Sequence, residues 1–119
     1  MRQQAIHFEL VGDVTIAALQ TTEITPNIGK ALRERLLELQ AAGRPARFIL
    51  DLSKLDFLGS VGLSVLVVFL KRVRASDGQV IISGLSGRCQ DVMTVTDLDK
   101  VFTLCDGVES ALHNIRAGA

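Results

Sequence analysis

A strand, a short loop and a helix follow one another in residues 47–75, and this unit constrains the fold more than any other part of the chain. RFILDLS, at its start, holds a continuous apolar run that predicts a buried strand. The loop after it carries Gly59, Ser60 and Gly62. The rest of the unit predicts a helix. Three valines would also suit a strand, but the length of the segment and the ASDG breaker after it favour a helix.

Upstream of this unit, the sequence predicts two strands and a helix. Residues 6–10 alternate apolar and polar side chains, and residues 14–20 form a second strand-like run after a turn at Gly12-Asp13. Thr25-Pro26 then predicts the start of a helix, with a hydroxyl cap and a proline in the first turn. This helix carries a clean apolar stripe, and Gly43 and Pro45 predict its end.

Downstream, the chain predicts two more pairs of a strand and a helix. The strand expected at 79–83 precedes a short helix that Ser86 can cap, and the strand expected at 101–104 precedes the last helix. For that last helix, Asp106 and Glu109 resemble a capping box. The order is therefore ββαβαβαβα, which implies βαβ units. We predict an α/β fold with a mostly parallel mixed sheet of about five strands packed with about four helices.

Length and composition narrow the class of protein. The 119 residues suggest a single domain, 1–119, and a hydrophobic content of 48% supplies a core without disulfides or a metal. A net charge of zero and the absence of Tyr and Trp disfavour nucleic-acid binding, which needs clustered cations and stacking rings. No signal peptide is visible, and the longest apolar run, 65–70, is too short to cross a membrane. We therefore expect a cytoplasmic protein with no direct membrane insertion.

Residues that would support catalysis or bind a cofactor are sparse. Neither common glycine-rich phosphate motif is present, and the Gly-Ser-Val-Gly step lacks the spacing of a nucleophile elbow. His7 and His113 lie near opposite ends of the chain, and Cys89 and Cys105 form no CxxC pair. We expect a non-enzymatic protein with no catalytic residue, no cofactor and no metal ion.

The loop before the long helix is the candidate functional segment. Asp51 and Asp56 flank it and could hold Mg²⁺, although turn capping is the commoner role of such residues. Ser60 stands at the predicted helix start, where its hydroxyl would either cap the helix or accept a phosphate. Free N–H groups and the helix dipole favour a phosphate there, and the added charge would repel a docked partner without unfolding the domain.

The long helix is apolar on nearly all sides. Leu63 to Leu70 contains a single polar residue, Ser64, across two turns. A helix packed on one face of a sheet needs a polar outer face. Either neighbouring helices bury both flanks, or the start of the helix forms a protein-binding patch. An exposed apolar start of this helix would also permit self-association, so a homodimer stands as an alternative.

The segment FILDLSKLDFLGSVGLSVL, residues 48–66, resembles the signature of the STAS domain, especially that of stand-alone anti-sigma-factor antagonists (anti-anti-sigma factors). The order of strands and helices agrees over essentially the whole chain, as does VIISGLSGRCQDVMTVTDLDKVF at 80–102. The residues that match the signature are Asp51, Leu52, Ser53, Phe57, Leu58, Ser60, Gly62 and Leu63.

This resemblance implies a function in partner switching. Such proteins bind an anti-sigma factor, often a serine kinase, and so free a sigma factor for transcription. The kinase inactivates the antagonist by phosphorylating the hydroxyl residue directly before the loop glycine, and a phosphatase reverses this. The partner-binding residues implied for this chain are Asp56, Gly59, Ser60, Val61, Gly62, Leu63 and Ser64.

The chain departs from the family at the switch position. Gly62 sets the register, so the acceptor position is Val61, which has no hydroxyl, and Gly59 replaces the usual Asp. Three interpretations stand. The protein is a permanently active antagonist, or Ser60 has become the phosphoacceptor with the help of the backbone freedom of Gly59. Otherwise the domain serves another STAS role, as a subunit of a lipid-transport ABC system or of a regulatory scaffold.

Overall fold

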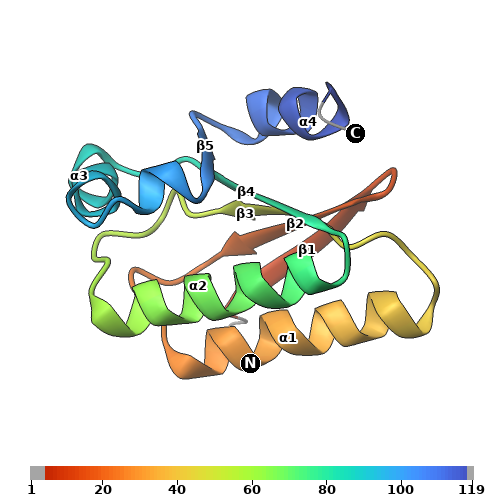
Figure 1. The fold of residues 1–119 in the computed structure, drawn as a ribbon. Helices are drawn as coiled ribbons and strands as arrows, with labels where there is room; N and C mark the ends of the chain where they lie inside the picture. Colours follow the sequence, from red (N-terminus) through yellow and green to blue (C-terminus); the bar gives the residue numbers. More distant parts are fainter. Residues whose placement is uncertain (1–4, 118–119) are drawn as a thin grey trace.

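A computed structural model describes residues 5–117 as a five-stranded sheet with helices on both faces (Figure 1). The sheet is mixed and mostly parallel, as predicted: β1 pairs antiparallel with β2, and every later pair is parallel. The carboxyl ends of β2 to β5 therefore meet at one edge of the sheet. The strands lie in sequence order: β1 (Ile6–Val11), β2 (Val14–Leu19), β3 (Arg47–Asp51), β4 (Gln79–Ser83) and β5 (Thr103–Cys105).

Four helices and one short 3-10 helix complete the described chain, in the predicted order ββαβαβαβα. Figure 1 shows α1 and α2 side by side on one face of the sheet and α4 on the other. The third helix adds Cys89 and Met93 to the core on the α1 and α2 side. The helices are α1 (Pro26–Ala41), α2 (Ser60–Ala75), α3 (Gly87–Val95) and α4 (Val108–Ala117), and the 3-10 helix η1 (Leu98–Lys100) precedes β5.

The third strand is buried on both faces, as its continuous apolar run predicts. Phe48 and Leu50 belong to the core under α1 and α2, whereas Ile49 belongs to the smaller core under α4. The Phe48 ring meets Phe69 of α2 edge-on, with ring centroids 4.9 Å apart. Alternate residues of one strand thus supply two separate cores, because successive side chains point to opposite faces of a sheet.

Three predicted helix boundaries are confirmed at the backbone. Gly43 adopts a φ of +68° after α1, and its N–H donates to the carbonyl of Gln40. Thr25 occupies the position before α1, with Pro26 as the first helical residue, but the Thr25 hydroxyl makes no capping bond, so the expected hydroxyl cap is wrong. The hydroxyl of Ser86 caps α3 by accepting from the backbone N–H of Cys89 at 3.3 Å.

The strand expected at 101–104 starts later than predicted. It spans Thr103–Cys105, because Val101 and Phe102 belong to the turn that follows η1. The N–H groups of Val101 and Phe102 both donate to the carbonyl of Leu98, so they are not available to a sheet ladder.

The capping box predicted before α4 is wrong. The helix begins at Val108, one residue later than a cap at Asp106 would require, and the preceding residue is Gly107. The hydroxyl of Ser110 serves this end instead: it donates to the carbonyl of Gly107 at 3.0 Å and accepts from the N–H of Gly107 at 3.3 Å.

Phe48→Ala should lower the free energy of unfolding by about 3–5 kcal/mol, because it removes a fully buried ring and leaves a cavity. Urea denaturation followed by circular dichroism measures this loss. Phe57→Ala is the matched control: its ring is 60% exposed, so the expected change is about 0.5 kcal/mol or less. Equal losses for the two variants would contradict the burial described for Phe48.

Candidate functional site

The loop that joins β3 to α2, residues 52–59, is fixed to the core at regular intervals. Every third residue is a buried leucine: Leu52, Leu55 and Leu58. The backbone N–H of Leu52 donates to the carbonyl of Ser83 at 2.9 Å, and that of Leu55 donates to the carbonyl of Leu52 at 3.1 Å. The exposed residues between these anchors therefore form a surface of defined shape.

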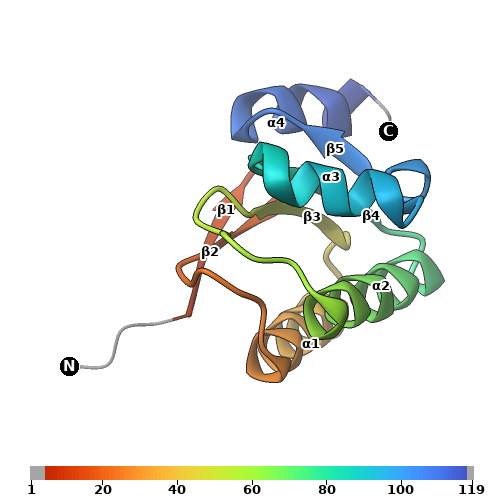
Figure 2. The ribbon, with the colours of Figure 1, turned by 90° about the vertical axis from the view of Figure 1, so that its left-hand side faces the viewer.

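A second set of bonds ties this loop to the segment that leads from β2 into α1. The backbone N–H groups of Asp56 and Phe57 both donate to the carbonyl of Thr22, at 2.8 and 3.2 Å. Figure 2 shows the two connecting segments running beside each other toward the starts of α1 and α2. The parallel pairing of β2 with β3 explains this, because both strands deliver the chain to the same edge.

Asp51, the last residue of β3, and Asp56, within the loop, differ in their surroundings. The Oδ1 atom of Asp51 accepts from the backbone N–H of Ser53 at 3.1 Å, which is the turn-capping role that its position predicts. Asp56 is exposed, and its backbone rather than its side chain holds the loop. Within residues 5–117, no group of three or more His, Cys, Asp or Glu side chains is placed to hold a metal ion.

Gly59, not Ser60, occupies the capping position of α2, so the prediction that Ser60 caps this helix is wrong. The backbone of Gly59 is extended, with φ −109° and ψ −166°, and its carbonyl accepts the helical bond from the N–H of Leu63 at 2.9 Å. Ser60 is already the first helical residue, and no side chain caps this end. The first turn of α2 therefore presents N–H groups without a side-chain partner, and such groups favour an anion or a hydrogen-bond acceptor.

Two large apolar side chains are exposed beside this helix start. Phe57 is 60% exposed and Val61 is 53% exposed. Between them and the start of α1 lies a hollow of about 280 Å³. It is lined by Phe57, Gly59, Ser60, Val61 and Gly62 on one side and by Glu23, Ile24, Thr25 and Pro26 on the other.

Gly62 allows the start of α2 to lie close to both connecting segments. A Cβ atom at this position would lie 3.1 Å from Cδ1 of Leu58 and 3.3 Å from Cβ of Ile24, which is tighter than ordinary contact. A glycine is therefore favoured here by packing. Its φ is ordinary and makes no such demand.

The predicted site residues do not all lie together. Residues 59–62 share the hollow. Leu63 is half-buried and packs against the main core, while Ser64 is exposed in a neighbouring groove between α1 and α2. Asp56 is exposed but does not line the hollow.

Sequence reasoning missed the other wall of the hollow. Ile24, Thr25 and Pro26 come from the segment between β2 and α1 and face the start of α2. A signal for them exists, because the carboxyl ends of neighbouring parallel strands meet at one edge and Thr25-Pro26 marks a helix start there. The sequence identifies Phe57 only as part of the family signature, and only the structure shows that its side chain is exposed.

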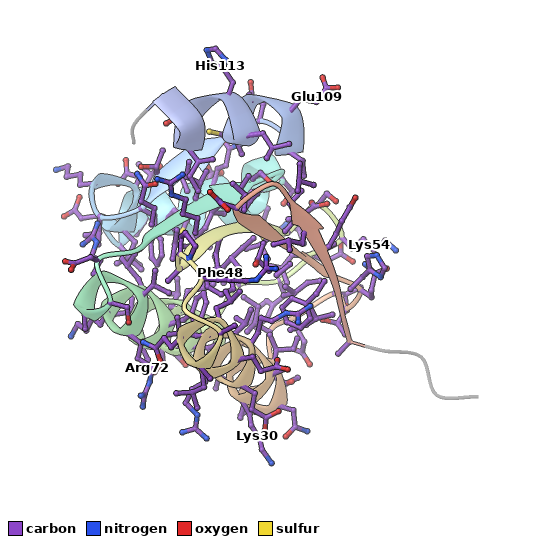
Figure 3. The ribbon with its side chains drawn as sticks, turned by 90° about the vertical axis from the view of Figure 1, so that its right-hand side faces the viewer. Lys30, Phe48, Lys54, Arg72, Glu109 and His113 are labelled. Atoms are coloured by element: carbon purple, nitrogen blue, oxygen red, sulfur yellow. The ribbon has the colours of Figure 1, made fainter. Side chains whose placement is uncertain are left out.

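The hollow is lined mainly by apolar and small side chains. Neither histidine lines the hollow: His7 lies on β1, and His113 projects from α4 on the face opposite to Lys30 (Figure 3). The exposed Phe57 ring and Val61 methyl groups can bury area against another molecule, and the N–H groups of the first turn can donate hydrogen bonds to an acceptor on it. None of the helices described here is long and apolar enough to pass through a membrane.

Fold and surface together define a small α/β domain with exposed apolar side chains at the start of α2. The sequence profile of the STAS domain matches residues 8–111. The chain belongs to the STAS domain family, as its signature segment indicates.

Relatives within this family include named regulators of sigma factors. The chain is 33% identical over 91 residues to the anti-sigma-F factor antagonist RsfB of Mycobacterium tuberculosis, a match that covers 74% of this chain and 70% of RsfB. The fold matches an anti-sigma factor antagonist from Mycobacterium paratuberculosis with a TM-score of 0.79 and 24% identity, over 93% of this chain and 92% of that one. It also matches a sulfate transporter family protein from Wolinella succinogenes with a TM-score of 0.76 and 16% identity, over 92% and 89% of the two chains.

Ser60→Ala should change the free energy of unfolding by about 0.5 kcal/mol or less, because its hydroxyl caps no helix. Ser86→Ala is the matched variant, since this serine does accept from the Cys89 N–H, and it should lower the free energy by about 1 kcal/mol. Urea titrations of the two variants beside the wild type compare these effects. A larger loss for Ser60→Ala than for Ser86→Ala would contradict the assignment of Gly59 as the cap.

Proposed function

We propose that this STAS protein is an anti-sigma factor antagonist that binds an anti-sigma factor through the start of α2 and so frees a sigma factor. The observation that carries the proposal is the exposure of Phe57 and Val61 beside an uncapped helix start. The anti-sigma-F factor antagonist among the relatives, 33% identical over 91 residues, supports the same class of partner. The partner proposed is a serine-kinase type, and the chain itself acts as a non-enzymatic module.

The hollow would be the centre of the interface and not its whole extent. A stable complex buries roughly 800 Å² on each partner, far more than one hollow supplies. Exposed apolar residues at the centre of an interface contribute most of its affinity, and a polar rim excludes water around them. Phe57 and Val61 would be the central contacts here, with Asp56 and Ser64 toward the rim.

The switch position determines how such a complex is regulated. Val61 is the second residue of α2. The resemblance to the family signature implies that the phosphoacceptor position falls on this residue. A valine offers no oxygen to a phosphoryl group, so a kinase partner could not inactivate the chain there. We propose a permanently active antagonist.

Ser60 is the rival acceptor. Its side chain is exposed at the first helical position, next to N–H groups that would stabilise a phosphate. Phosphorylation at this residue would restore regulation by a kinase partner.

Val61→Asp should abolish capture of the anti-sigma factor, because it places a charge at the centre of the proposed interface. The fold should survive, since the residue is exposed and a carboxylate in the first turn of a helix is stabilising by about 0.3–1 kcal/mol. Affinity capture from the native lysate, with mass spectrometry of the retained proteins, measures the effect. Val95→Asp is the matched control, because Val95 is an 84% exposed valine at the end of α3 and lies outside the proposed interface.

The outcome separates this function from the other STAS roles. Retention of an anti-sigma factor by the wild type and by Val95→Asp, with loss in Val61→Asp, supports the proposal. Retention of permease or ATPase components, or of other STAS proteins, unchanged by Val61→Asp, would show a transport or scaffold subunit instead.

Phosphorylation by the captured kinase tests the switch. The wild-type chain should take up no phosphate when incubated with the kinase and ATP, whereas Val61→Ser should be modified at the new hydroxyl. Intact-mass spectrometry with peptide mapping locates the phosphate. Modification of wild-type protein that disappears in Ser60→Ala would show that Ser60 is the acceptor and that the antagonist is not permanently active.

A further inference from the structure

A groove runs between α1 and α2 next to the hollow at the start of α2. It has a volume of about 330 Å³ and a floor that includes Val65, Val68 and Gly29. Gly29 deepens it, because a Cβ atom there would lie 3.1 Å from Cγ1 of Val65. Although α2 packs on α1, Val68 is still 48% exposed, so this part of the helix has no cover within residues 5–117.

The walls of the groove are basic. Lys30 and Arg33 line it from α1, and Arg72 lines it from α2. Figure 3 shows Lys30 and Arg72 reaching outward on the same side of the molecule, away from the sheet. No acidic residue lines the groove, and none of these three side chains forms an ion pair or a hydrogen bond within residues 5–117. The chain as a whole has a net charge of zero, so this excess of positive charge is local.

The groove and the hollow form one continuous surface. Pro26 lines both of them. Val61 and Val68 are seven residues apart on α2, which places them on one face about two turns apart. An apolar strip therefore starts at Phe57 and Val61 and continues along the groove toward the three cations.

We propose that this groove binds an acidic amphipathic segment of the same anti-sigma factor that docks at the start of α2. This inference rests on the proposed function. The groove extends over residues 26–33 of α1 and 64–72 of α2, roughly 10–12 Å of each helix, which matches about two turns of a bound helix. Such a segment places its apolar face on Val65 and Val68, and its Asp or Glu side chains lie toward Arg33 and Arg72.

A macromolecular segment fits this groove better than a small anionic amphiphile does. Ligand pockets for small molecules bury roughly 70–90% of the ligand surface. Here Val68 on the floor is 48% exposed and the walls are Lys and Arg side chains, so an acyl chain would stay largely in water. A partner that also covers Phe57 and Val61 excludes water from the groove as part of a larger interface.

Exposed cations at the edge of an interface act mainly on the rate of association. They attract an acidic partner before contact, and salt screens this attraction. Arg33→Glu combined with Arg72→Glu should therefore lower the association rate about tenfold at low ionic strength, with a much smaller effect on dissociation. At about 0.5 M NaCl the variant and the wild type should converge, because the screening length there is only a few ångströms.

Surface plasmon resonance over a range of NaCl concentrations measures both rates. The probe is the purified anti-sigma factor retained by the wild-type chain in the capture experiment above. Arg44→Glu is the control: it reverses one positive charge, half of the charge change in the double variant, just beyond the end of α1, outside the groove and without a side-chain partner in the described chain. It should stay within about twofold of the wild type at every salt concentration.

These variants distinguish two outcomes: that the partner does not use the groove, and that the proposed function itself is wrong. If Val61→Asp abolishes binding but the double groove variant behaves like Arg44→Glu, the partner does not use the groove and the proposed function stands. If the wild type retains no anti-sigma factor, both proposals are overturned. If dodecanoate added to the wild-type chain shifts the backbone NMR signals of Gly29, Val65 and Arg72, the groove is a site for a small amphiphile instead.

Discussion

Burial of β3 on both faces is the constraint on which the rest of the structure depends. Phe48, Ile49 and Leu50 have no exposed surface, so strands must pair on both sides of β3 and helices must cover both faces. The chain then leaves β3 at the carboxyl edge of the sheet and must return across one face before β4 begins. The first turn of α2 is consequently placed at that edge, beside the segment that β2 delivers to α1. The position of the candidate site therefore follows from the path of the chain between β3 and β4.

Much of the fold could be predicted from the sequence because burial is periodic. The strand run from Arg47, the stripe of α1 and the Ser86 cap all depend on neighbours within a few residues, and the structure confirms them. Predictions from local sequence were wrong where tertiary contacts determine the backbone conformation. Two helices have a glycine at the position before their first turn, Gly59 for α2 and Gly107 for α4, although a polar side chain stood close to each.

Only one wall of the hollow could be predicted from the sequence. The motif around Ser60 to Gly62 is contiguous in sequence, so pattern and resemblance could find it. Its opposite wall, around Ile24 to Pro26, belongs to a segment more than thirty residues earlier. Those residues reach the site through the parallel register of β2 and β3 and through the bonds to the Thr22 carbonyl. No local pattern encodes such a contact, and neither does it encode the exposure of Phe57.

The apolar residues of α2 are only partly buried by the fold. Leu66, Phe69 and Val73 are buried in the core, and α1 covers part of the next face. Val61 and Val68 are left about half exposed, so they add little to the stability of the fold and increase the risk of association with other chains. Under the proposed function, these exposed side chains contact the partner.

In the proposed function, a valine at the switch position changes how the complex with the anti-sigma factor can be regulated. Under the proposed function, covalent inactivation at Val61 is impossible, so occupancy of the anti-sigma factor depends on concentrations and affinities alone. Antagonist and sigma factor then compete by mass action, and the speed of the exchange matters. A basic groove beside an apolar docking surface favours rapid capture of an acidic partner, because charge mainly raises the association rate while apolar burial slows dissociation. The two parts of this surface would therefore control different rates. Lys30, Arg33 and Arg72 would set how quickly the anti-sigma factor is captured. Phe57 and Val61 would set how long it is held.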